Sequence, residues 1–110
     1  MTLGRGMRIL PALVAQLCEC YDGWIVGSAA LKFPDVELRD YDVIIPYSRW
    51  KEAALLIPKD AHPNTFGGWK CLSEGKEVDV WPGDLSIHFT HHISRYAWHP
   101  KSGTRLERVS

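Results

Sequence analysis

The segment from Asp40 to Pro46 constrains the fold of this chain most, because it opens an apolar run with two carboxylates one residue apart. Side chains alternate between the faces of a β-strand, so Asp40 and Asp42 are expected on one face, with Tyr41 and Val43 on the other. Like charges side by side repel each other, and a divalent cation removes that repulsion. Mg²⁺ takes hard oxygen ligands, usually one or two carboxylates together with substrate phosphates. The segment therefore predicts a strand with one buried face and one metal-binding face.

A second segment, from Trp24 to Leu31, predicts a buried strand that turns directly into a helix. Gly27 removes the side chain at the turn, and Ser28 is a favourable N-cap residue. The free backbone N–H groups at the start of a helix lie at its positive end, which suits a phosphate. Pro34 ends this helix early, so the chain returns quickly to the carboxylate strand.

A third segment, from Lys76 to Trp81, alternates acidic and apolar residues and predicts another strand. If Val78 and Val80 face the core, Asp79 lies on the side of the sheet that would carry the carboxylate pair. The alternative interpretation is that Asp79, like Glu77, is an ordinary charge on the polar face of a hairpin.

Together these segments resemble the nucleotidyltransferase superfamily, which includes DNA polymerase beta, the antibiotic nucleotidyltransferases and the minimal nucleotidyltransferase modules. The family pattern is a hydrophobic residue before Gly-Ser, then an acidic-x-acidic strand, then one more acid on a later strand. Here the pattern matches Gly27 and Ser28, Asp40 and Asp42, and Asp79, over about residues 21–84.

The resemblance implies a two-metal site that uses Mg²⁺ or Mn²⁺. In it, Asp40 and Asp42 would hold the nucleotide-bound metal, and Asp79 would share the second metal and help activate the acceptor hydroxyl. Gly27 and Ser28 would bind the triphosphate. The implied activity is transfer of a nucleoside monophosphate from an NTP such as ATP to a hydroxyl, with release of pyrophosphate. RNA, a protein and a small molecule all remain open as the acceptor.

Two departures from the family support an alternative hypothesis. Ala29 and Ala30 stand where antitoxin-type minimal modules carry an arginine, and no long helical domain follows the third acid. The alternative is a catalytically silent nucleotide- or protein-binding module of the same fold. Such a module would be antitoxin-like or would act as a partner subunit.

Composition limits the classes of protein to which this chain can belong. A length of 110 residues and a hydrophobic fraction of 45% predict one domain spanning 1–110. Thirteen basic and thirteen acidic residues give no net charge, which disfavours binding of long duplex nucleic acid. Apolar stretches fall far short of the roughly 20 residues that cross a bilayer, so no membrane partner is expected. Three cysteines and no signal peptide predict a cytoplasmic location.

The predicted fold class is α+β: a small mixed β-sheet with helices packed on one face and an acidic cleft at the sheet edge. Helical spacing runs from Leu10 to Tyr21, and a second helix is expected from a Ser48 cap to Ile57. Residues 59–66 indicate a loop and residues 68–81 a hairpin. A terminal hairpin is expected over about residues 95–110.

A partner surface is expected in that terminal hairpin. Ligand sites favour clefts between domains or subunits, and a single small sheet offers little wall for a second substrate. The segment from Arg95 to Arg108 mixes basic and aromatic residues. We therefore expect this segment to contribute to acceptor binding in a homo- or hetero-oligomer.

Overall fold

In the part of the chain that the structure describes, seven strands form one mixed sheet in the order β3-β4-β5-β2-β1-β6-β7. The structure is a computed structural model that describes residues 10–27, 29–30, 38–85 and 96–107. Among the described strands, β2 and β5 pair in parallel, and every other neighbouring pair is antiparallel. The strands are β1 (Trp24–Val26), β2 (Asp40–Ile45), β3 (His62–Pro63), β4 (Trp69–Ser73), β5 (Lys76–Pro82), β6 (Tyr96–His99) and β7 (Thr104–Glu107).

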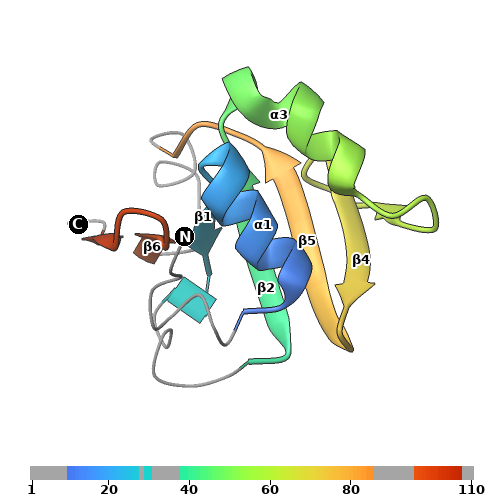
Figure 1. Ribbon diagram of the computed structural model, residues 1–110, viewed down its shortest axis with the longest axis horizontal. Coiled ribbons are helices and arrows are strands. Elements are labelled where there is room, and N and C mark those ends of the chain that lie inside the picture. The colour runs from blue at the N-terminus through green and yellow to red at the C-terminus, as the bar shows by residue number, and fades with distance from the viewer. Residues whose placement is uncertain (1–9, 28, 31–37, 86–95, 108–110) are drawn as a thin grey trace.

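The helices α1 (Ala12–Tyr21) and α3 (Tyr47–Ala53) cover the same face of this sheet (Figure 1). A short 3₁₀ helix, η2 (Ala54–Leu56), follows α3 directly. The larger apolar core lies between these helices and the sheet. Its most deeply buried residues include Val14, Leu17, Ile25, Tyr41, Val43, Ile45, Val78 and Val80. The α+β class, the mixed sheet and the helices on one face are therefore confirmed.

The start of α1 is held by the turn between β4 and β5. Pro11 precedes the helix and offers no capping side chain, so the first N–H groups need other acceptors. Ala12 N–H donates to Glu74 Oε1, and Leu13 N–H donates to Ser73 Oγ, both at 3.3 Å. The hairpin that carries Asp79 is thus fixed to the first helix.

The carboxylate strand has the predicted two faces but not the predicted position. Tyr41 and Val43 are buried under the helices, whereas Asp40 and Asp42 lie on the opposite, second face of the sheet. However, β2 is a central strand, so an acidic cleft at the sheet edge was a wrong prediction. The reason is that β5 pairs with one side of β2 in parallel and β1 with the other.

Two local predictions were also wrong. Ser48 does not cap α3, because the helix begins at Tyr47, and its N-cap residue is Pro46, which has no capping side chain. Residues 59–66 are not wholly a loop, because β3 pairs with β4 there. The predicted end of the short helix at Pro34 lies outside the described residues.

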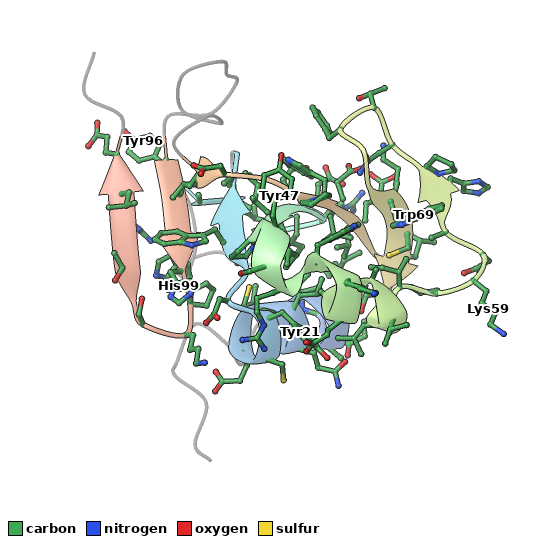
Figure 2. All side chains as sticks on the ribbon, turned by 90° about the horizontal axis from the view of Figure 1, so that it is seen from above. Tyr21, Tyr47, Lys59, Trp69, Tyr96 and His99 are labelled. Atoms are coloured by element: carbon green, nitrogen blue, oxygen red, sulfur yellow. The ribbon has the colours of Figure 1, made fainter. Side chains whose placement is uncertain are left out.

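The second face carries a smaller apolar cluster beside the carboxylates. Val26, Ile44 and Ala97 are almost fully buried there, with Trp24 and Trp81 packed against them. The β6–β7 hairpin, which carries His99, and the loop that carries Lys59 lie at opposite ends of the molecule (Figure 2). The predicted terminal hairpin is therefore present, and its first strand pairs with β1 inside the sheet.

Candidate functional site

The strand register joins one row of residues across the second face of the sheet. Residues directly opposite each other on paired strands point to the same face. The row runs through all seven strands as His62, Lys70, Asp79, Asp42, Val26, Ala97 and Leu106. At its centre, Lys70, Asp79 and Asp42 follow one another on β4, β5 and β2.

Four carboxylates gather on this face in two adjacent rows. Asp42 lies opposite Asp79, and Asp40 lies opposite Glu77, because β2 and β5 run parallel and in register. Partial burial raises the pKa of Asp42 to about 6, and the negative charges of Asp79 and Asp40 contribute to that rise. A side-chain hydrogen bond with Asp40, together with its charge, raises the pKa of Glu77. The face thus concentrates negative charge around Asp42.

Gly27 borders this cluster and makes close packing possible. It follows β1 with a φ of +77°, a left-handed conformation that glycine adopts without strain. A Cβ atom at this position would lie 2.8 Å from Asp42 Oδ2, so a larger residue would collide with the carboxylate. Gly27 C=O accepts a hydrogen bond from Ala30 N–H at 3.1 Å, which starts a helical turn. Ser28, the other predicted phosphate-binding residue, lies outside the described residues.

Both carboxylate oxygens of Asp79 contact neighbouring side chains, which orient it. Asn64 Nδ2 donates to Asp79 Oδ1 at 3.2 Å, and Lys70 Nζ lies 3.8 Å from Asp79 Oδ2. Asn64 is itself fixed, because its Oδ1 accepts from Phe66 N–H at 3.0 Å and Gly68 N–H at 2.9 Å. The loop before β4 therefore positions the third acid of the predicted pattern.

The donor set suits a hard cation such as Mg²⁺, with Asp42 and Asp79 as the facing pair. Burial is the main cause of the raised pKa of Asp42, and the repulsion from Asp79 and Asp40 that adds to it would be relieved by such a cation. Over residues 10–27, 29–30, 38–85 and 96–107, no group of three or more His, Cys, Asp or Glu side chains is arranged to hold a metal ion. Asp40, Asp42 and Asp79 share one face and Asp42 lies directly opposite Asp79, but these three carboxylates are not arranged around one metal position.

Sequence reasoning missed three residues of this cluster. Glu77 and Asp79 are two residues apart along β5, as Asp40 and Asp42 are along β2. The two-residue period of a strand therefore predicts that Glu77 lies on the same face as Asp79. Lys70 lies in the predicted hairpin, but its place opposite Asp79 depends on the observed turn, in which Ser73 pairs with Lys76. Asn64 has no sequence signal, because its contact depends on how the preceding loop folds.

Comparison with protein-family models, with curated proteins and with solved structures finds no match to this chain. Within the described residues, no helix is long and apolar enough to span a membrane. The three cysteines, Cys18, Cys20 and Cys71, are all free thiols.

Proposed function

We propose that this chain is a magnesium-dependent nucleotidyltransferase that transfers a nucleoside monophosphate from an NTP to a hydroxyl acceptor. The observation that carries the proposal is the facing pair Asp42 and Asp79 beside Gly27. Two partly buried acids that face each other on central strands repel each other and destabilise the free protein. A ligand that neutralises their charge would remove this repulsion, which is why the pair indicates a cation-binding site. A family resemblance in the sequence pattern supports the same activity.

The residues of the cluster have distinct roles in this proposal. Asp40 and Asp42 would bind the nucleotide-bound metal, and Asp79 would bind the second metal and orient the acceptor hydroxyl. Mg²⁺ or Mn²⁺, when bound, would supply charge neutralisation at the phosphates and the leaving group. Gly27 lets the Asp42 carboxylate lie close against the backbone after β1, and Ser28 would donate to the phosphate oxygens. Asn64 would keep Asp79 aimed at the acceptor.

Lys70 has a role that follows from its ion pair. In the free protein its ammonium group lies 3.8 Å from Asp79 Oδ2. A metal on Asp79 would displace that ammonium group, and the triphosphate is then the nearest anion for it to contact. Lys70 would thus exchange one anionic partner for another when substrate binds.

The direct test measures pyrophosphate release from each NTP with Mg²⁺ or Mn²⁺ present. We expect metal-dependent release by the wild-type chain and its loss in Asp42→Asn. Asp60→Asn is a matched control, because Asp60 is an exposed acid outside the cluster. Pyrophosphate release that persists undiminished in Asp42→Asn would refute the assignment of the site.

A second candidate function is a catalytically silent nucleotide-binding module. The observation that favours it is that both oxygens of Asp79 already have protein partners. In that case NTP with Mg²⁺ would still raise the melting temperature by linkage, without pyrophosphate release. Asp42→Asn would abolish the rise, whereas Asp60→Asn would leave it unchanged.

We also propose that the acceptor is bound partly by another chain, through the edge formed by β7. All four residues of β7 are exposed, including Leu106 at 38%. An exposed strand at the edge of a sheet is a template for pairing with a strand of a second chain. Sedimentation of wild type and Leu106→Glu tests this proposal: the variant should dissociate an assembly that the wild type forms. A wild-type chain that stays monomeric with acceptor present would refute it.

A further inference from the structure

The turn between β6 and β7 places a serine, a histidine and an aspartate in a row. Ser102 Oγ lies 2.6 Å from His99 Nδ1, and His99 Nε2 lies 3.9 Å from Asp22 Oδ1. Asp22 comes from a distant part of the chain, since it is the C-cap residue of α1. A hydroxyl, an imidazole and a carboxylate in this order are the groups that activate a serine in nucleophilic catalysis.

The hydrogen bonds of this turn determine which nitrogen of His99 carries the hydrogen. Ser102 N–H donates to Nδ1 at 3.2 Å, so Nδ1 is an acceptor and the neutral ring carries its hydrogen on Nε2, toward Asp22. The 2.6 Å contact between Nδ1 and Ser102 Oγ then requires the hydroxyl hydrogen of Ser102. The hydroxyl is therefore already bonded to the base that would accept its proton.

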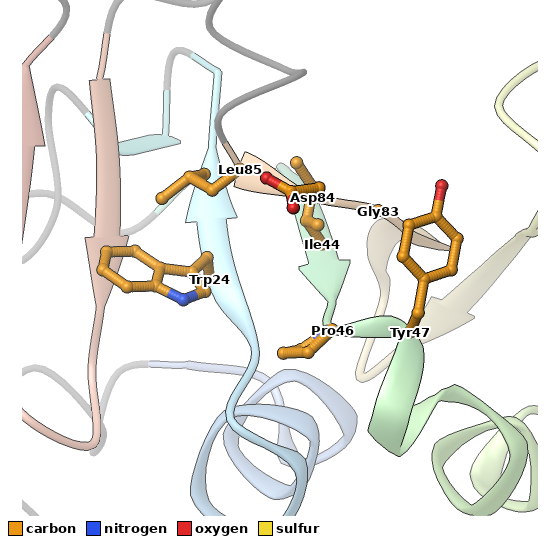
Figure 3. A pocket seen from close by; sticks show the side chains of 7 residues that line it. All are labelled: Trp24, Ile44, Pro46, Tyr47, Gly83, Asp84 and Leu85. Atoms are coloured by element: carbon orange, nitrogen blue, oxygen red, sulfur yellow. The ribbon is translucent and has the colours of Figure 1, made fainter.

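The surroundings of His99 favour its neutral form. The side chain is only 13% exposed, and its ring packs on the Trp24 ring with centroids 4.8 Å apart. Trp24 also lines a pocket of about 340 Å³ at the end of β2 (Figure 3). Burial lowers the pKa of His99, the negative charge of Asp22 raises it, and the positive charge of Lys101 lowers it. An unprotonated ring at neutral pH is the form that a general base needs.

Ser102 is accessible, and its oxygen is oriented by the start of β7. The residue is exposed to solvent. Thr104 N–H donates to Ser102 Oγ at 3.2 Å, and Thr104 Oγ1 lies 2.8 Å from the same oxygen. A backbone donor aimed at Oγ stabilises the negative charge that develops there as the proton leaves. Ser102 thus combines access, orientation and a neighbouring base.

We propose that Ser102 is an activated nucleophile and the site at which activated carboxylic esters acylate this chain, with His99 as the general base. Ser102 Oγ attacks the carbonyl carbon while its proton passes to His99 Nδ1. The C–O bond to the leaving alcohol then breaks, and the alcohol takes that proton from Nδ1. The products are the acylated Ser102 and the free alcohol, and His99 is neutral again. Asp22 is a positioning residue, because it stabilises the positive charge that the ring carries between the two steps.

The test uses p-nitrophenyl acetate as the probe, with the full wild-type chain and with no nucleotide or metal present. Peptide mapping by mass spectrometry measures acetylation of Ser102 separately from that of Ser48, an exposed serine on α3, and of the exposed thiol of Cys20. General-base catalysis contributes roughly 10²–10⁴-fold, so we expect Ser102 to be acetylated at least about a hundredfold faster than Ser48. Equal rates at the two serines would overturn the proposal. Because the assay contains no NTP, its result is independent of the proposed transferase function.

A first variant removes the base. His99→Gln should lower acetylation of Ser102 about a hundredfold, toward the rate at Ser48. Ser48→Ala is the matched control and should leave the rate at Ser102 unchanged. Because His99 packs on Trp24, circular dichroism checks that the variant is folded. An undiminished rate at Ser102 in folded His99→Gln would refute the role of His99.

A second variant tests the positioning role and keeps the backbone at that position. Asp22 has a φ of +57°, a conformation in which asparagine is also common, so Asp22→Asn should fold. The wild-type rate should rise with pH to a plateau, with a midpoint below the ordinary pKa of histidine. Asp22→Asn should move this midpoint to lower pH and reduce the plateau about tenfold, because the carboxylate no longer stabilises the protonated ring.

The opposite shift is expected when the neighbouring cation is removed. The charged groups that face this row are Asp22, Lys101 of the turn and Arg49 of α3, which also pairs with Asp22. Lys101→Gln should move the midpoint to higher pH, because the charge of Lys101 lowers the pKa of His99. A midpoint that stays in place in both Asp22→Asn and Lys101→Gln would show that His99 is not the titrating base and would overturn the proposal.

Discussion

At the scale of single residues, Asp42 carries the largest electrostatic cost among the acids of the second face. Its carboxylate is half-buried, and it has Asp79 opposite it and Asp40 two positions away. Its pKa is raised from the usual value to about 6, so the folded protein holds the proton more tightly than the unfolded chain. The stabilising contribution of that proton is complete below the unfolded pKa and is lost as the pH rises through about 6.

The first prediction follows from this loss of stability with rising pH. The free energy of unfolding of wild type should increase when the pH is lowered from 7.5 to 5.5, and Asp42→Asn should show a smaller increase. At pH 7.5 we expect Asp42→Asn to be more stable than wild type by about 1–2 kcal/mol, after allowance for solvent screening. Urea unfolding at both pH values, with Asp60→Asn as control, measures the difference. A less stable Asp42→Asn at pH 7.5 would contradict the electrostatic account.

The second prediction concerns Lys70. Its charge lowers the pKa of Asp42, and its ammonium group pairs with Asp79. Lys70→Gln removes a competitor for Asp79, so Mg²⁺ in the absence of NTP should bind about threefold to tenfold more tightly. Mg²⁺-dependent binding of NTP should weaken in the same variant, because the proposed phosphate contact is lost. Calorimetric titration with and without NTP measures both effects, and Lys51→Gln on α3 is the matched control. A change of the same sign in both titrations would contradict the exchange of partners.

At the scale of elements, the turn from Asn64 to Gly68 determines how β4 meets the candidate site. Asn64 bonds to two N–H groups of this turn and to Asp79. Phe66 stacks on Trp81 of β5, with ring centroids 4.6 Å apart. Gly68 packs against β5 so closely that a Cβ would lie 1.9 Å from Val80 O. The position of the turn against β5 therefore requires that Gly68 has no side chain.

The third prediction is that Gly68→Ala lowers the free energy of unfolding by more than about 2 kcal/mol. The obstructing atom belongs to the backbone of a central strand, so a small side-chain movement does not relieve the collision. Thr65→Ala, an exposed position in the same turn, should change stability by less than about 0.5 kcal/mol. Urea unfolding of the two variants checks the contrast. Equal free energies of unfolding for the two variants would show that the turn accommodates the added methyl group without loss of stability.

The sequence predicts the local elements better than their arrangement. Alternation of polar and apolar residues correctly assigns the faces of β2 and β5, because strand geometry depends on the local chain. The parallel pairing of β2 with β5, which brings Asp42 to Asp79, is a long-range contact and has no local signal. The central place of β2 and the contact of Asn64 with Asp79 were missed for the same reason.

At the scale of the whole molecule, the terminal hairpin is a structural part of the sheet. β6 pairs with β1, and its residues Ala97 and Trp98 are buried in the two apolar clusters. The segment that the sequence suggested as a partner surface therefore has two different strands. β6 belongs to the core, and β7 forms the exposed edge.

The fourth prediction is that a chain truncated before Tyr96 does not fold cooperatively. Truncation removes buried residues and leaves the backbone of β1 unpaired on one side, which costs several kcal/mol in a small domain. Loss of a sigmoidal urea transition monitored by circular dichroism checks this result. Leu106→Glu at the edge should retain the transition. A cooperatively folding truncation would show that β6 is dispensable.

The order of the strands also governs when the chain can fold during synthesis. β1 is made early, yet one of its two neighbours is β6, whose residues follow it by most of the length of the domain. Pairing β2 with β5 likewise has to wait for the intervening residues. Closing such long loops precedes any gain from the contacts they bring, which slows folding relative to a domain of local contacts. On the ribosome, this sheet is therefore completed late, with the edge of β1 uncovered until the last hairpin emerges.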